Sequence, residues 1–202
     1  MGFGTICYFC HQPTEHRFCD HCSDQLKPSF SMVPVMPNIC LGGRLFLYQG
    51  AVKQVIQDVK FNSNFRLAQC LAEYYLPSCI PPVFFDVDAW VIVPSHWFRQ
   101  LCRGRPHLPF LFQSMNDHGM NGSHWLKRVR YTATSVGLSR TQRRLNAQKN
   151  RFAWLGPSLV QRVTILDDVM TTGETLIEIA RLLRSHGVHT VMSLVLAYQS
   201  NA

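Results

Sequence analysis

Residues 163–175 read VTILDDVMTTGET, and this stretch decides the fold class. Val163 to Leu166 form a short apolar run of the kind that makes a buried strand. Two acids and a Thr-Thr-Gly turn follow, and a helix is expected next because apolar residues recur at helical spacing, at Leu176, Ile179, Ala180, Leu182 and Leu183. Gly187 marks the end of this helix, and residues 188–197 return as an apolar strand. This order predicts a βαβ unit in a parallel, doubly wound sheet.

Further α/β elements are expected upstream of this unit. Residues 45–48 favour a short strand, residues 88–93 favour a buried strand closed by Pro94, and two helices are expected between them. The helical positions are Ala51, Val52, Val55, Ile56 and Val59, then Leu67, Cys70, Leu71, Tyr74 and Tyr75. A chain of 202 residues buries one core with a small appendage, so we divide it into residues 1–30 and residues 31–202.

Four cysteines near the N-terminus follow the spacing C-x2-C-x8-C-x2-C, at Cys7, Cys10, Cys19 and Cys22. Two such pairs present four thiolates to one tetrahedral ion, which is typical of structural zinc. Zinc would supply the folding energy that a segment poor in aliphatic residues lacks. Four cysteines with no shared ion are the alternative. The remaining cysteines, Cys40, Cys70, Cys79 and Cys102, are interpreted as buried apolar residues.

The loop after the acidic pair has the composition of a phosphate site. Gly173 allows backbone amides to approach a phosphate, and hydroxyl donors come from Thr171, Thr172 and Thr175. Asp167 and Asp168 are then placed to accept hydrogen bonds from two ribose hydroxyls. The alternative is a polar helix cap without a ligand, because Ser, Thr and Asp favour helix starts.

At this point the sequence resembles the type I phosphoribosyltransferases, whose ligand motif is a hydrophobic run, two acids and Thr-Thr-Gly-x-Thr. With the four-cysteine module ahead of it, the chain resembles the ComF competence family, which is associated with DNA uptake in natural transformation. The resemblance implies a phosphoribosyltransferase-like sheet flanked by helices. It also implies that phosphoribosyl pyrophosphate or ribose 5-phosphate binds at Asp167, Asp168, Thr171, Thr172, Gly173 and Thr175, with Mg2+ accompanying the pyrophosphate.

The same resemblance places the pyrophosphate at Ser95, His96 and Trp97 and a catalytic loop over residues 128–146. The family pattern is not followed at residues 105–107, which read Arg-Pro-His, or at Ser135. These positions border the implied pyrophosphate and acceptor sites. We therefore assign no catalytic residue, and whether the chain is an enzyme is left open.

Positive charge gathers in one stretch of this chain, whose net charge is +8. Between His118 and Leu166 there is no acid, and the basic residues there are Lys127, Arg128, Arg130, Arg140, Arg143, Arg144, Lys149, Arg151 and Arg162. Such a run attracts polyphosphates or nucleic acid, although a solvated basic face is the alternative. We predict single-stranded DNA binding through Arg128, Arg130, Arg140, Arg143 and Arg144, with base stacking on Trp125, Tyr131, Phe152 or Trp154.

Three functions fit these features. The first is a DNA-uptake protein that holds single-stranded DNA and works with other DNA-uptake proteins, as the family resemblance implies. The second is a transferase that passes ribose 5-phosphate to a nitrogen nucleophile, and the third is a sensor of the donor. No apolar stretch reaches the length of a membrane span and no signal peptide is evident, so we expect a cytoplasmic protein without membrane insertion.

Overall fold

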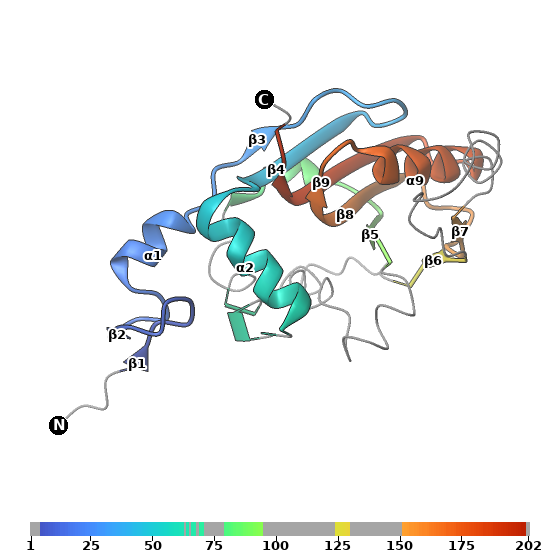
Figure 1. Cartoon of the computed structure of the whole chain (residues 1–202). Helices are drawn as coiled ribbons and strands as arrows, with labels where there is room; N and C mark the ends of the chain where they lie inside the picture. The colour runs from blue at the N-terminus through green and yellow to red at the C-terminus, as the bar shows by residue number, and fades with distance from the viewer. Residues whose placement is uncertain are drawn as a thin grey trace, which may run out of the picture.

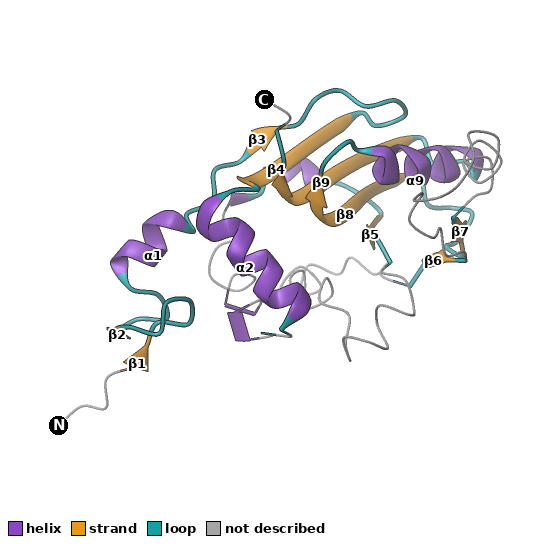
Figure 2. Cartoon of the chain, in the orientation of Figure 1, coloured by secondary structure: helices purple, strands orange, loops and turns teal. Residues whose placement is uncertain are grey.

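The computed structural model describes residues 5–62, 64, 66–67, 69–70, 79–94, 124–129 and 151–200 (Figures 1 and 2). These contain a five-stranded sheet in the order β3-β4-β9-β8-β5. Its strands are β3 (Ser31–Met32), β4 (Leu41–Leu47), β5 (Ala89–Ile92), β8 (Arg162–Met170) and β9 (Thr190–Tyr198). The four strands from β4 to β5 are parallel, and β3 pairs antiparallel with β4 at the edge. The predicted α/β class with a largely parallel sheet is confirmed.

Helices cover both faces of the sheet. Helix α2 (Gly50–Phe61) lies against one face and helix α9 (Glu174–Ser185) against the other (Figure 1). Alternate residues of β9 serve the two faces, because Met192 and Leu194 pack on the α2 side while Val191 and Val195 pack on the α9 side. Burial on both faces explains why β9 reads as a continuous apolar run.

The β8–α9–β9 unit forms as the sequence predicts, with one correction. The predicted strand ends at Leu166, but β8 continues to Met170 because its ladder with β9 extends from the Asp167–Val195 pair to the Met170–Tyr198 pair. The acidic pair therefore lies inside the strand rather than after it. This difference determines where the two carboxyl groups point.

The expected upstream elements are also present. The helical spacing at residues 51–59 is confirmed by α2, and the strand expected at 88–93 is β5. In the second expected helix, Leu67 and Cys70 are helical and buried, and residues 71–78 lie outside the described part of the chain. A short 3-10 helix, η1 (Pro82–Phe84), precedes β5 and buries Phe84.

The N-terminal segment forms a small module against the first turns of α2 (Figure 1). It contains the pair β1 (Thr5–Ile6) and β2 (Pro13–Thr14), followed by helix α1 (Asp20–Gln25). Phe18, Cys22 and Leu26 belong to the same buried cluster as the inward face of α2. The boundary at residue 30 stays a prediction, and packing is continuous across it.

A separate antiparallel pair lies within the predicted basic segment, His118 to Leu166. Strands β6 (Leu126–Arg128) and β7 (Phe152–Trp154) pair with Arg128 opposite Phe152. Leu126 and Phe152 are buried in the cluster beneath α9. Among the helices in the described part of the chain, none combines the length and the hydrophobicity that crossing a bilayer requires.

Candidate functional site

The two acids at the end of β8 point to opposite faces of the sheet. Successive side chains alternate along a strand, so Asp168 lies on the α2 side with Leu166, and Asp167 lies on the α9 side with Ile165. Each carboxyl accepts a hydrogen bond from the next amide. The Asp168 N–H donates to Asp167 Oδ1 at 2.9 Å, and the Val169 N–H donates to Asp168 Oδ1 at 2.6 Å.

A lysine that the sequence analysis did not single out contacts this pair. Lys60 Nζ, in the last turn of α2, lies 2.8 Å from Asp168 Oδ1, and both side chains are largely buried. Burial, followed by the negative charge of Asp168, raises the pKa of Asp167 to about 8, while the positive charges of Lys60 and Arg128 act in the opposite direction. The two acids therefore share a site in which a proton is held near neutral pH.

The loop that follows leaves hydroxyls and amides accessible. Thr171 and Thr172 are exposed, and Thr175 is partly exposed in the first turn of α9. Gly173 is the N-cap of α9 and has a left-handed backbone with φ 77°, so no side chain at the cap occupies the first amides of the helix. The amide of Glu174 donates a long hydrogen bond to Thr172 Oγ1 at 3.5 Å, and the helix dipole favours an anion at this position.

Two methionine side chains pack closely against Gly173. A Cβ at this position would lie 2.7 Å from Met36 Sδ and 3.2 Å from Met170 Cε. Met36, in the connector between β3 and β4, is buried against this turn. The connector therefore supports the loop from the side opposite to solvent.

The basic segment is only partly described. Arg128, at the end of β6, is one of its predicted DNA ligands, and its guanidinium lies 5.5 Å from the centre of the Phe152 ring. Two other basic residues of the segment form ion pairs within the fold: Arg151 with Glu178, and Arg162 with Asp86 and Asp88. The other residues predicted to bind DNA lie outside the described part of the chain, at Arg130, Arg140, Arg143 and Arg144. So do Ser95, His96 and Trp97, which are predicted to bind the pyrophosphate.

The aromatic residues proposed for base stacking differ in accessibility. Phe152 is buried beneath the guanidinium groups of Arg128 and Arg151, so it belongs to the core and is not a stacking platform. Trp125 and Trp154 are partly buried and pack edge to face, with ring centres 5.9 Å apart. Tyr131 lies outside the described residues.

The four N-terminal cysteines converge as their spacing predicts. The Sγ atoms of Cys7, Cys10, Cys19 and Cys22 all lie within 4.8 Å of one another. Thiolates around one zinc ion at about 2.3 Å are separated by about 3.8 Å, so the four sulfurs fit a tetrahedral ion after a small contraction. All four positions would be filled by protein, which is the arrangement of a structural rather than a catalytic metal.

The thiols of this cluster differ in acidity. Burial disfavours the Cys7 thiolate, but hydrogen bonds from the amides of Cys10, Cys19 and Phe9 lower its pKa to about 6. Burial and the neighbouring thiols raise the pKa of Cys22. A cation would replace the protons that these crowded sulfurs hold.

Cys40 corrects our expectation of buried cysteines outside the module. Its thiol is exposed and accepts a hydrogen bond from Arg184 Nη2 at 3.2 Å.

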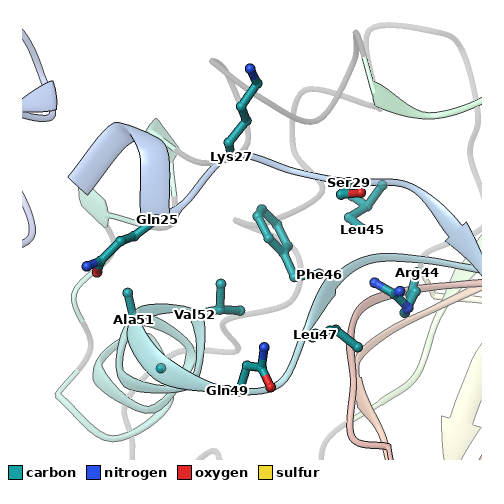
Figure 3. Close-up of a pocket in the computed structure, with 11 residues that line it drawn as sticks. Gln25, Lys27, Ser29, Arg44, Leu45, Phe46, Leu47, Gln49, Ala51 and Val52 are labelled. Atoms are coloured by element: carbon teal, nitrogen blue, oxygen red, sulfur yellow. The ribbon is translucent and has the colours of Figure 1, made fainter. Parts of the chain in front are cut away.

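A concavity of about 400 Å³ lies at the other end of α2 (Figure 3). It is lined by the segment after α1, the carboxyl end of β4 and the first turn of α2. Two cationic side chains, Lys27 and Arg44, contribute to its wall, and Lys27 extends away from Phe46 and Ala51 (Figure 3). The sequence analysis did not identify this surface. Gly50 and Lys60 are about 15 Å apart along the helix axis, so the concavity is separate from the acidic pair.

Comparison with known proteins supports the class suggested by the fold. Residues 154–202 match the family described as phosphoribosyl transferase domain. The chain is 30% identical over 190 residues to Competence protein F of Haemophilus influenzae, covering 86% of this chain and 76% of that protein. It is 29% identical over 201 residues to DNA utilization protein YhgH of Escherichia coli and 28% identical to that of Shigella flexneri, covering 93% of this chain and 81% of each relative.

The parallel sheet, the acidic pair at the end of β8 and the hydroxyl-rich turn before α9 define an α/β domain of the phosphoribosyltransferase type. A four-cysteine cluster that could hold a metal precedes this domain. On the similarity to Competence protein F over most of both sequences, the chain belongs to the ComF family.

We predict one zinc ion per chain in the purified protein. Cys22→Ser removes one of four thiolates and should lower both the zinc content and the thermal stability, because metal binding contributes to folding of the module. Elemental analysis and calorimetric unfolding measure the two quantities. Cys40→Ser, which changes an exposed thiol outside the cluster, is the control and should retain the metal. Wild-type protein that is folded at its N-terminus but contains no metal would contradict the prediction.

We also predict that the raised pKa of Asp167 makes stability depend on pH. The folded state holds this proton more tightly than the unfolded state, in which the pKa is near 3.8, so the free energy of unfolding falls as the pH rises from about 4 to about 8. The slope is at most about 1.4 kcal/mol per pH unit for one proton. Asp167→Asn should remove this contribution, so its stability relative to wild type increases with pH in urea denaturation. Asp24→Asn, at an exposed position on α1, is the control. Parallel pH profiles for wild type and Asp167→Asn would show that Asp167 does not hold the proton.

Proposed function

We propose that this protein handles incoming DNA in the cytoplasm and binds phosphoribosyl pyrophosphate or ribose 5-phosphate on its phosphoribosyltransferase-type domain. The observation that carries the proposal is the β8–α9 junction, where a carboxyl pair, two exposed threonines and an uncapped helix start adjoin. A phosphorylated ribose has vicinal hydroxyls that donate to carboxylates and a phosphate that accepts from amides and hydroxyls. The junction presents both sets of partners within a few residues.

The phosphate is assigned to residues 171–175 in this proposal, and the ribose hydroxyls to Asp167 and Asp168. The start of α9 favours the charge of the phosphate, and Thr171 and Thr172 are exposed in the loop that precedes it. The opposite orientation of the two carboxyls means that the ribose would lie across the end of β8, in contact with the strand edge. Mg2+ would accompany the pyrophosphate and neutralise part of its charge.

The DNA assignment is supported by the names of the relatives and by charge. Two of the similar proteins are described as Competence protein F and DNA utilization protein YhgH. The acid-free stretch from His118 to Leu166 carries nine basic residues, of which Arg151 and Arg162 are paired within the fold. Five of the nine are the residues that we assign to phosphates of single-stranded DNA: Arg128, Arg130, Arg140, Arg143 and Arg144.

Transfer of ribose 5-phosphate to a nitrogen nucleophile is the second candidate, favoured by the match to the phosphoribosyl transferase domain. Departure of pyrophosphate leaves positive charge on the ribose and negative charge on the leaving group, so catalysis would need Mg2+ and basic side chains at the pyrophosphate. Incubation with Mg2+, phosphoribosyl pyrophosphate and a panel of bases and amines tests this candidate by release of pyrophosphate. Binding of phosphoribosyl pyrophosphate without release of pyrophosphate would favour a sensor function.

We predict that ribose 5-phosphate and Mg2+-phosphoribosyl pyrophosphate bind to the wild type and bind more weakly to Asp168→Asn. A hydrogen bond to a charged group contributes about 1.5–3 kcal/mol, which corresponds to a roughly ten- to hundredfold rise in Kd. Asparagine is preferred to alanine because it keeps the shape of a buried side chain that accepts the Val169 N–H. Isothermal titration calorimetry measures the affinity, and Asp24→Asn is the control. Equal affinities for wild type and Asp168→Asn would place the ligand elsewhere.

We predict that single-stranded DNA binds with a strong dependence on salt. If about four phosphates are neutralised, log affinity should fall with log salt at a slope of roughly −3, and each arginine removed should flatten it by about 0.7. The triple variant Arg140→Ala, Arg143→Ala and Arg144→Ala is tested by fluorescence anisotropy with a labelled oligonucleotide. A second triple variant at Lys27, Lys53 and Arg181 removes three exposed charges elsewhere and is the matched control. Unchanged affinity in the arginine variant would show that this segment does not bind DNA, and the transferase or sensor function would then be favoured.

A further inference from the structure

Lys60 connects helix α2 to the acidic pair. Its Nζ atom lies 2.8 Å from Asp168 Oδ1, with 19% of the lysine side chain and 11% of the aspartate side chain exposed. The same oxygen accepts the Val169 N–H. This ion pair is therefore largely shielded from water. The attraction between two charges is stronger in such a site than at the surface.

The fold determines this contact. Val52, Val55, Ile56 and Val59 are buried along one face of α2, and this packing sets the rotation of the helix. The lysine next to Val59 is thereby directed to the end of β8, on the face of the sheet to which Asp168 points. A lysine on the exposed face of α2 would not make this contact.

The charges around Asp167 and Asp168 suggest a role for Lys60. Two positive charges are recorded beside the acids: Lys60 from α2, which pairs with Asp168, and Arg128 from β6, which together with Lys60 acts on Asp167. Two adjacent carboxyl groups cannot both remain ionised at low cost, and an incoming phosphate adds further negative charge. The Lys60 ammonium, held next to Asp168, favours the charged form of that carboxyl group and fixes the direction of its oxygens.

We propose that Lys60 is a positioning residue of the phosphoribosyl site, holding Asp168 as an oriented carboxylate that accepts a ribose hydroxyl. This inference rests on the proposed function, because it assigns the ligand to the same carboxyl pair. Lys60 acts through Asp168 and need not touch the ligand. Its role is distinct from that of the threonines and amides, which bind the phosphate.

The test measures the Kd of ribose 5-phosphate between pH 5 and 9 for wild type, Lys60→Met and Lys60→Arg. Loss of the neighbouring positive charge raises the pKa of a carboxyl group, so the pH at which binding becomes strong should move upward in Lys60→Met by about one unit. The affinity of this variant near neutral pH should fall about tenfold. Lys60→Arg keeps the charge and should keep the position of the profile. Lys53→Met, an exposed lysine of the same helix, is the matched control and should behave as wild type.

A double-mutant cycle separates positioning from direct contact. In the Asp168→Asn background, Lys60→Met should add little further loss, because the carboxylate on which the lysine acts is absent. If Lys60→Met does not fold, Lys60→Gln replaces it in both measurements.

Three outcomes decide between the explanations. An unchanged pH profile in Lys60→Met overturns the inference and leaves the proposed function intact. An equal loss at every pH, or full additivity with Asp168→Asn, also overturns it, because the lysine would then act on stability or directly on the phosphate. No binding by the wild type at any pH overturns the proposed function itself, and the inference falls with it.

Discussion

The parallel ladder between β8 and β9 is the constraint on which the rest of the structure depends. It continues past the apolar run to Met170, so both acids lie within the strand, and their side chains leave it on opposite faces. Each face of the sheet must then accommodate one carboxyl group. On the α2 face Lys60 pairs with Asp168, and on the other face burial raises the pKa of Asp167 while the positive charge of Arg128 acts in the opposite direction.

Helix α2 relates the two parts of the molecule that carry chemistry. Its first turns pack against the cysteine module (Figure 1). Its last turn carries Lys60, whose Nζ contacts Asp168 Oδ1. A module of this size buries little apolar surface, and the shared cluster with α2 supplies part of what it lacks. The metal that the four sulfurs could hold would then secure one end of the helix that delivers the lysine at the other.

Local patterns predicted those features that depend on neighbours in sequence. The spacing of the cysteines predicted their convergence, the period of the apolar residues predicted α2 and α9, and Gly173 was expected at the turn before α9. The end of β8 was missed because it depends on pairing with β9, which no local pattern records. Lys60 was missed for the same reason, since a lysine in the last turn of a helix is ordinary and its partner is 108 positions away. Met36 behind Gly173 is a third contact of this kind.

The register of the β6–β7 pair has a consequence for how members of this family can diverge. Arg128 lies opposite Phe152, so the β6–β7 pair holds the two ends of the stretch between them side by side, and the pair Arg151–Glu178 fastens the second end to α9. The pairing itself involves only these two ends. Lengthening such a connection costs little, since each doubling of a loop adds about 0.6 kcal/mol of closure entropy. The stretch between β6 and β7 can therefore change in evolution to suit a new partner while the sheet and its helices keep their stability.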